Sequence, residues 1–142
     1  MASTYGSKWR SYGGVLFDDA GRVLLRKPTN EFDGYVWTFA KGRLDGNSTP
    51  EETALREVRE ETGYTATILG AVPGEYPGGS SVTFYYIMSP DGAPQPFDSA
   101  ETEEIRWSEY EEAVELIGQT RNVVGRQRDL AVLQAAYAEY RR

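Results

Sequence analysis

The chain has 142 residues, a net charge of −7, and neither cysteine nor histidine. This length predicts one domain over residues 1–142, and the negative charge argues against a broad basic surface for duplex nucleic acid. Without Cys and His the chain cannot form typical zinc sites or Ser-His and Cys-His catalytic pairs, so we expect Asp, Glu, Lys or Tyr to carry acid–base chemistry and any metal to be a hard, oxygen-binding ion.

The first third of the chain alternates short apolar runs with turns. Residues 13–17 (GGVLF) predict a strand, and residues 22–26 (RVLLR) predict its hairpin partner. A polar loop at 28–34 follows, and the aromatic and β-branched residues at 35–39 (YVWTF) predict a third strand. Two glycines and several turn-forming residues predict a loop at 41–48.

A helix is predicted next, at residues 50–62. Thr49 is a suitable N-cap residue, and Pro50 favours the first helical position. Glu52, three residues after Thr49, completes a capping box, and Gly63 is a natural residue with which to end the helix.

The second half of the chain combines strands and helices. Apolar runs predict strands at 66–72, 82–88 and 104–107, a helix at 108–117 and an amphipathic C-terminal helix at 123–140. Strands mixed with helices, with a hairpin among them, predict an α/β fold in which helices cover both faces of a mixed sheet.

The predicted helix at 50–62 places three carboxylates together. Glu57, Glu60 and Glu61 share an arc of about 100° beside the buried stripe formed by Ala54 and Val58. An exposed helix face with salt bridges is one explanation. A divalent cation is another, because carboxylates at i, i+3 and i+4 converge on one face and their mutual repulsion becomes attraction around a metal.

The stretch GRLDGNSTPEETALREVREETGY, residues 42–64, resembles the Nudix box. The positions that match the family spacing are Gly42, Arg56, Glu57, Val58, Glu60, Glu61, Gly63 and Tyr64. The order of the surrounding strands also resembles the family. The resemblance implies a Nudix-type α/β/α sandwich with a mixed β-sheet, in agreement with the fold predicted from the residues.

Three positions depart from the family pattern. Ser48 stands where the family has a glutamate that supports the conserved arginine, so we expect Arg56 to have lost one partner, with reduced activity or a rearranged loop. Ala40 replaces a frequent proline and should slightly loosen the turn. Tyr64 replaces an aliphatic residue and is a minor change.

The resemblance also implies a chemistry, the metal-dependent hydrolysis of a diphosphate bond in substrates that link a nucleoside diphosphate to another group. Glu57, Glu60 and Glu61 would hold Mg²⁺, for which Mn²⁺ could substitute, and a main-chain carbonyl near Lys41 would add a ligand. The catalytic residues implied are Glu61 or Glu101 as the general base, with Arg56 orienting the carboxylates. An ordinary acidic loop residue is the alternative for Glu101.

Substrate contacts are expected from basic and aromatic side chains near the box. The basic candidates for phosphate binding are Arg26, Lys27, Lys41 and Arg43, with exposed salt bridges as the alternative. The tyrosines that could stack on a base are Tyr35, Tyr76 and Tyr85. Trp37 and Trp107 are expected to serve packing.

The segment WTFAKG before the box resembles the dinucleoside polyphosphate branch of the family, so diadenosine polyphosphates are the first substrate expectation. ADP-ribose, nucleotide sugars and nucleoside triphosphates are alternatives, as is a catalytically weak nucleotide sensor on the same fold. No run of eighteen apolar residues predicts a membrane span, and the first 14 residues lack the apolar segment of a signal peptide. We therefore expect a cytoplasmic protein with no membrane partner, for which the family also implies a possible homodimer.

Overall fold

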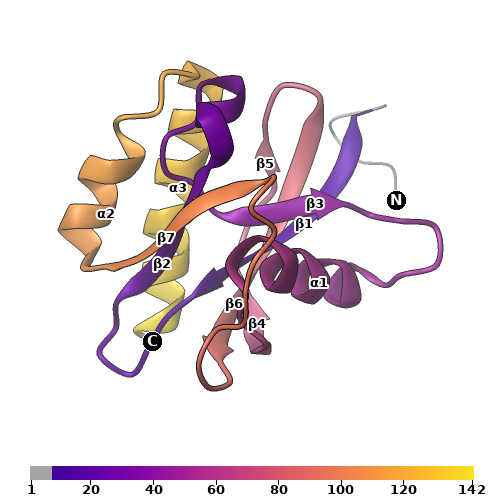
Figure 1. Cartoon of the computed structure of the whole chain (residues 1–142), viewed down its shortest axis with the longest axis vertical. Helices are drawn as coiled ribbons and strands as arrows, with labels where there is room; N and C mark the ends of the chain where they lie inside the picture. The colour runs from indigo at the N-terminus through magenta and orange to yellow at the C-terminus, as the bar shows by residue number, and fades with distance from the viewer. Residues whose placement is uncertain (1–7) are drawn as a thin grey trace.

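The computed structural model describes residues 8–142, so the start of the chain, including half of the segment examined for a signal peptide, lies outside the described residues. Figure 1 shows the arrangement of the elements. In chain order these are β1 (Trp9–Leu16), β2 (Val23–Pro28), the 3-10 segment η1 (Thr29–Gly34), β3 (Ala40–Arg43), α1 (Pro50–Thr62), β4 (Ala66–Ala71), β5 (Tyr76–Pro77), β6 (Ser81–Pro90), β7 (Thr102–Ser108), α2 (Tyr110–Ile117) and α3 (Val123–Tyr140).

The strands form two sheets. The larger sheet has the order β3-β1-β6-β4, with β5 paired to β6, and the smaller one pairs β2 with β7. Strand β1 runs parallel to β6, whereas the other pairs are antiparallel. The predicted α/β fold with a mixed sheet is confirmed.

Helices cover both faces of the larger sheet (Figure 1). Alternate residues of a strand point to opposite faces. On β1, Tyr12 and Leu16 join the core beneath α1, whereas Val15 packs in the core that α2 and α3 cover. The chain therefore builds two apolar layers around one sheet.

The strand predicted at 35–39 is absent. Of these residues only Thr38 makes a β-bridge, to Arg26, and regular pairing begins at Ala40, opposite Gly14. Trp37 and Phe39 are nevertheless buried in the core. The aromatic side chains of this segment are buried without its backbone forming a strand. The predicted strand was therefore wrong, whereas the expectation that Trp37 packs in the core is confirmed. The predicted loop at 41–48 in turn begins with the end of β3.

The predicted hairpin between the first two strands is reduced to one bridge, between Phe17 and Val23. Strand β2 pairs instead with β7, far along the chain. Leu24 and Leu25 point to opposite faces and are both buried, one in each apolar layer. Strand β2 therefore contributes side chains to both apolar layers, as β1 does, although it belongs to the smaller sheet.

Helices α1 and α3 have the predicted bounds. The capping box is formed as expected: the Glu52 amide donates to the Thr49 hydroxyl, and the Thr49 amide donates to the Glu52 carboxylate. Gly63 ends α1 with φ of 82°, a conformation that glycine adopts without strain. Among residues 8–142, no helix is both long and apolar enough to span a membrane.

Candidate active site

A cavity of about 770 Å³ opens beside the glutamate face of α1. Its walls come from α1, β2, η1, β3 and the segment before it, the loop before β6, the loop before β7, and α3. The charged residues that line it are Arg26, Asp33, Lys41, Glu61, Glu101 and Arg128. Of the predicted site residues, the cavity therefore brings together Arg26, Tyr35, Lys41, Glu61 and Glu101.

Glu61 is the most deeply placed of the three box glutamates. Its side chain is 8% exposed, and its Oε1 accepts a hydrogen bond from the Lys41 amide at 3.1 Å. Arg26 Nη1 lies 3.6 Å from the same oxygen. Burial outweighs the positive charge of Arg26 and raises the pKa of Glu61 to about 8, with the nearby carboxylates acting in the same direction.

Glu57 lies against the loop that precedes α1. A Cβ at Gly42 would fall 2.2 Å from Glu57 Cδ, so the close approach of this carboxylate requires glycine there. Burial, followed by the negative charge of Glu60, raises the pKa of Glu57, and a contact with the Glu61 carboxyl acts in the opposite direction. The pKa values of Glu57 and Glu61, which are neighbours on one helix face, are thus both raised, so each carboxyl binds its proton more tightly than an isolated glutamate does.

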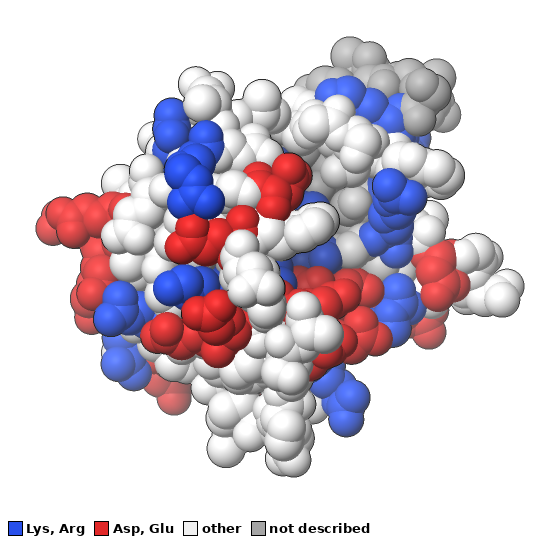
Figure 2. Space-filling view, turned by 45° about the horizontal axis from the view of Figure 1, so that its top comes forward, with Lys and Arg blue, Asp and Glu red and all other residues white. Residues whose placement is uncertain are grey.

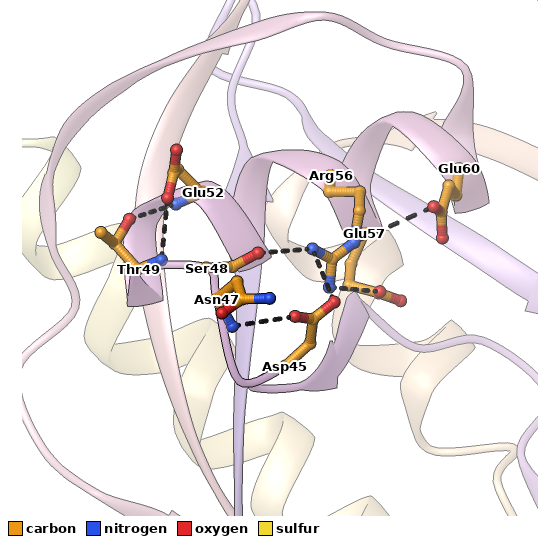
Figure 3. A network of polar contacts seen from close by, with 8 residues as sticks. All are labelled: Asp45, Asn47, Ser48, Thr49, Glu52, Arg56, Glu57 and Glu60. Atoms are coloured by element: carbon orange, nitrogen blue, oxygen red, sulfur yellow. Dashed lines mark hydrogen bonds and ion pairs between the residues drawn. The ribbon is translucent and has the colours of Figure 1, made fainter.

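Arg56 joins the helix to the loop through a network of four contacts (Figure 3). Its guanidinium lies 3.6 Å from Glu57 Oε2 and 4.0 Å from Glu60 Oε1. On the loop side it donates to the Ser48 hydroxyl at 3.1 Å and lies 3.7 Å from Asp45 Oδ2. The expectation that Ser48 deprives Arg56 of a partner is wrong, because Ser48 retains the hydrogen bond and Asp45 supplies the negative charge.

Glu101 reaches the same cavity from the loop before β7. Its carbonyl accepts hydrogen bonds from Arg26 Nη2 at 2.7 Å and from the Thr29 amide at 3.0 Å. Its negative charge contributes to the raised pKa of both Glu57 and Glu61. Arg26 therefore holds two carboxylate-bearing segments, β7 and α1, at the same wall.

The donor set fits a divalent cation. Across residues 8–142, no three acidic side chains are grouped closely enough to hold a metal ion, and Arg26 and Arg56 form ion pairs with Glu61 and Glu57. Buried carboxyls with raised pKa values are costly to ionise alone. A hard cation would stabilise their charged forms, and carboxylate and carbonyl oxygens are the ligands that Mg²⁺ and Mn²⁺ prefer.

Lys41 lines the cavity from β3. Burial lowers the pKa of its ammonium, as does the positive charge of Arg128, whereas Asp129 and Glu61 act against this. Tyr35 lines the cavity nearby, with Arg128 lying 5.4 Å from the centre of its ring.

Arg128 and Asp129 were not predicted as site residues. Asp129 is fully buried, accepts a hydrogen bond from Thr38 at 2.6 Å, and receives another from Arg128 Nε at 3.0 Å. The sequence did carry a signal, because these residues precede the buried Val132 and Leu133 by four positions and so lie on the apolar stripe of α3. Charges on such a stripe require partners or a function.

Four of the predicted substrate-binding residues lie outside the cavity lining. Lys27 pairs with Glu103 at 3.9 Å, and the Arg43 guanidinium lies 4.6 Å from the centre of the Trp9 ring. Tyr76 donates a hydrogen bond to the Pro73 carbonyl and packs edge-on against Tyr85.

Tyr85 is 1% exposed within the core, so it is not available to stack on a base, and its assignment as a substrate contact was wrong. Its strand neighbour Tyr86 is half-buried on the opposite face. Trp107 packs as expected, and its indole donates to the Tyr64 hydroxyl at 3.0 Å.

Charges of both signs are interspersed on the face shown in Figure 2, with no broad basic area. That distribution agrees with the net charge of −7.

The site thus combines a mixed sheet, an acidic helix and a cavity lined by three basic and three acidic side chains. The chain matches the family model of the NUDIX domain over residues 7–128 and belongs to the NUDIX family. The predicted family is thereby confirmed.

Curated relatives match over parts of their length. An RNA pyrophosphohydrolase of Gluconacetobacter diazotrophicus is 41% identical over 71 residues, which are 45% of this chain and 42% of that protein. An 8-oxo-dGTP diphosphatase of Proteus vulgaris is 30% identical over 80 residues, 54% of this chain and 71% of that protein. A CMP-5'-(N-acetyl-N-hydroxy-3-aminopropyl)phosphonate hydrolase of Streptomyces rubellomurinus is 33% identical, over 77% of this chain and 55% of that protein.

Solved structures share the fold. A C. elegans Ap4A hydrolase has a TM-score of 0.73 at 20% identity, over 92% of this chain and 98% of that one. The E. coli ORF135 protein has a TM-score of 0.66 at 20% identity, over 93% of this chain and 90% of that one. Likeness at this level of identity supports the architecture and leaves the substrate open.

Proposed function

We propose that this protein is a divalent-metal-dependent pyrophosphohydrolase that cleaves the diphosphate linkage of nucleotide-type substrates. The observation that carries the proposal is a pair of neighbouring carboxyls with raised pKa values, the buried Glu61 and the partly buried Glu57, of which Glu61 lines a cavity that also contains Arg26 and Lys41. Membership of the NUDIX family and the names of its hydrolase relatives support it.

In this proposal Glu57, Glu60 and Glu61 hold Mg²⁺, or Mn²⁺ in its place, and the carbonyl of Lys41 adds a ligand. A bound divalent cation supplies charge neutralisation at the bridging phosphate oxygens and a lowered pKa for the attacking water. Arg56 is a positioning residue, since it contacts Glu57 and Glu60 from the side of the loop.

The proton of the attacking water passes to Glu61 or Glu101, both of which line the cavity. Glu61 is buried and held by the Lys41 amide, whereas Glu101 is exposed at the opening. Arg26 lies between their segments and keeps the two carboxylates at one wall.

The first substrate class to test is the diadenosine polyphosphates, as suggested by the WTFAKG segment. Tyr35 borders the cavity and is available to a base. ADP-ribose, nucleotide sugars and nucleoside triphosphates are the alternatives, and the 8-oxo-dGTP diphosphatase relative keeps the triphosphates in contention. A small-molecule nucleotide substrate, without duplex nucleic acid or membrane, and a cytoplasmic location complete the proposal. A homodimer is compatible with it.

The second candidate is a sensor that binds nucleotides without cleaving them, suggested by Ser48 in place of the family glutamate. The hydrogen bond from Arg56 to Ser48 weighs against it, because the conserved arginine remains held.

The deciding experiment is phosphate-release kinetics over a panel of diadenosine polyphosphates, ADP-ribose, nucleotide sugars and nucleoside triphosphates, with Mg²⁺ and with EDTA. Glu60→Gln and Glu61→Gln should each lower kcat by at least about 100-fold. Glu115→Gln, an exposed change of the same kind on α2, is the matched control. Binding without turnover of any substrate would favour the sensor, and turnover that is indifferent to EDTA and to both variants would refute the metal site.

A further inference from the structure

Two cationic side chains line the cavity with unused hydrogen-bond donors. Lys41 lies on β3 next to the box, and Arg128 lies in the second turn of α3. The Lys41 ammonium forms no hydrogen bond or ion pair with any residue in 8–142. Arg128 Nη2 is buried and likewise has no hydrogen-bond partner within that range.

Arg128 is held so that part of its guanidinium remains available. Its side chain is 3% exposed, and its Nε donates to Asp129. Both Asp129 oxygens are already engaged, one by Arg128 and the other by the Thr38 hydroxyl. The nearest carboxylate therefore fixes the guanidinium through one edge and leaves Nη2 without an acceptor.

Arg128 is close enough to Lys41 for its positive charge to lower the pKa of the Lys41 ammonium, and both side chains line the same cavity. Two cations that face one cavity repel, and burying them without acceptors is unfavourable. An anionic oxygen between them would remove both costs, because an arginine and a lysine provide only donors. Arg26, the third cation of the cavity, is already engaged by Glu61, Thr102 and the Glu101 carbonyl.

We propose that Lys41 and Arg128 form an anion subsite that binds a non-scissile phosphate of the substrate, apart from the phosphate processed at the box glutamates. The subsite rests on the proposed function and adds to it a second phosphate contact, made by the C-terminal helix and β3 rather than by the box glutamates. Arg128 acts as a specificity-determining residue supplied by the C-terminal helix, outside the box.

The test is a chain-length series in binding. Affinities of AMP, ADP and ATP are measured by calorimetry with Mg²⁺, for the wild-type chain, Arg128→Gln and Lys41→Gln. Loss of a charged hydrogen bond should weaken ATP binding by about 10- to 100-fold in each variant, while AMP changes by less than about 3-fold. In the double variant, the second substitution should lower ATP affinity by a smaller factor than it does in the wild-type chain, because both side chains bind the same phosphate.

A second variant displaces the Arg128 side chain without removing it. This variant is needed because Arg128→Gln leaves the buried Asp129 without its partner and could prevent folding. A Cβ at Gly78 would fall 2.8 Å from Arg128 Nη1, so Gly78→Ala should shift the guanidinium and weaken ATP binding in the same selective way. Gly70→Ala, which adds a methyl group with no heavy atom within 4 Å, controls for the loss of a glycine. Arg126→Gln controls for removing one charge from α3.

The subsite is supported if ATP affinity falls selectively with Arg128→Gln or Gly78→Ala and with Lys41→Gln, while both controls keep wild-type affinity. An equal loss for AMP and ATP would overturn it, since the pair would then contact the nucleoside or the α-phosphate, which both ligands share. Unchanged ATP binding in folded variants, or no binding of ATP by the wild-type chain, would also overturn it. Failure of the wild-type chain to hydrolyse any nucleotide, with the selective binding pattern intact, would refute the proposed hydrolase and leave the subsite standing.

Discussion

The Ser48 hydroxyl accepts a hydrogen bond from Arg56 Nη1 at 3.1 Å, across the loop that leads into α1 (Figure 3). Asp45 lies 3.7 Å from the same nitrogen. Ser48 and Asp45 thus both bind Arg56, which in turn contacts Glu57 and Glu60. We therefore expect that Arg56 stays in place when only one of the two loop residues is replaced.

Ser48→Ala should lower kcat by about 2- to 5-fold, because one neutral hydrogen bond of about 1 kcal/mol is lost while Asp45 remains. Combining it with Asp45→Asn should cost more than the sum of the single changes, since Arg56 then has no partner in the loop. Steady-state kinetics of the two single variants and the double variant measure this coupling. Strict additivity would show that the two residues do not share Arg56.

Gly42→Ala should weaken Mg²⁺ or Mn²⁺ binding by about 10-fold, because its Cβ would fall 2.2 Å from Glu57 Cδ and push that carboxylate off the helix face. Gly46→Ala is the matched control in the same loop, where an added Cβ meets nothing within 4 Å. Metal titration followed by calorimetry separates the two. Equal metal affinity in both variants would contradict a role for Glu57 as a ligand.

Stability without metal should fall as pH rises, because the folded-state pKa of Glu61 is raised to about 8 from an ordinary value of 4.5. Between these values the folded chain binds more protons than the unfolded chain, so the stabilisation present below pH 4.5 is lost as pH passes through about 8. Added Mg²⁺ should therefore raise Tm more at pH 8.5 than at pH 6.

Thermal melts with EDTA at pH 5.5 and 8.5 test this linkage. Glu61→Gln should remove much of the decrease in Tm between pH 5.5 and 8.5, and should raise Tm at pH 8.5 by on the order of 5 °C. Glu115→Gln, an exposed change on α2, should follow the wild-type chain. A variant Glu61→Gln that keeps the full pH dependence would show that Glu61 does not carry the proton.

Glu101→Gln distinguishes the two candidate bases. If Glu101 accepts the proton of the attacking water, kcat should fall by about 100-fold or more while metal affinity stays within about 3-fold of the wild-type value. If Glu61 is the base, Glu101→Gln should change kcat by less than about 5-fold. The pH dependence of kcat for the same variant provides an independent check, because loss of the base removes the acidic limb of the profile.

Much of the site could be predicted from the sequence because its signals are local. Residues 42–64 carry the helix, its caps and the three glutamates within one continuous segment, and helical geometry alone places those side chains on one face. The capping box and the end at Gly63 follow from short-range hydrogen bonds, which few neighbours can override. The mixed α/β architecture followed from the alternation of periodicities for the same reason.

The tertiary structure decided which distant side chains complete that face. Burial moved Tyr85 from the substrate candidates into the core and placed Arg43 on Trp9, while Arg128 entered the cavity from the last helix. Strand β2 pairs with β7, about 80 residues further along the chain, rather than with β1. Such outcomes depend on long-range packing, in which each side chain competes for contact with distant segments. The sequence by itself therefore determined helix α1 and its glutamate face, and only the fold determined what surrounds them.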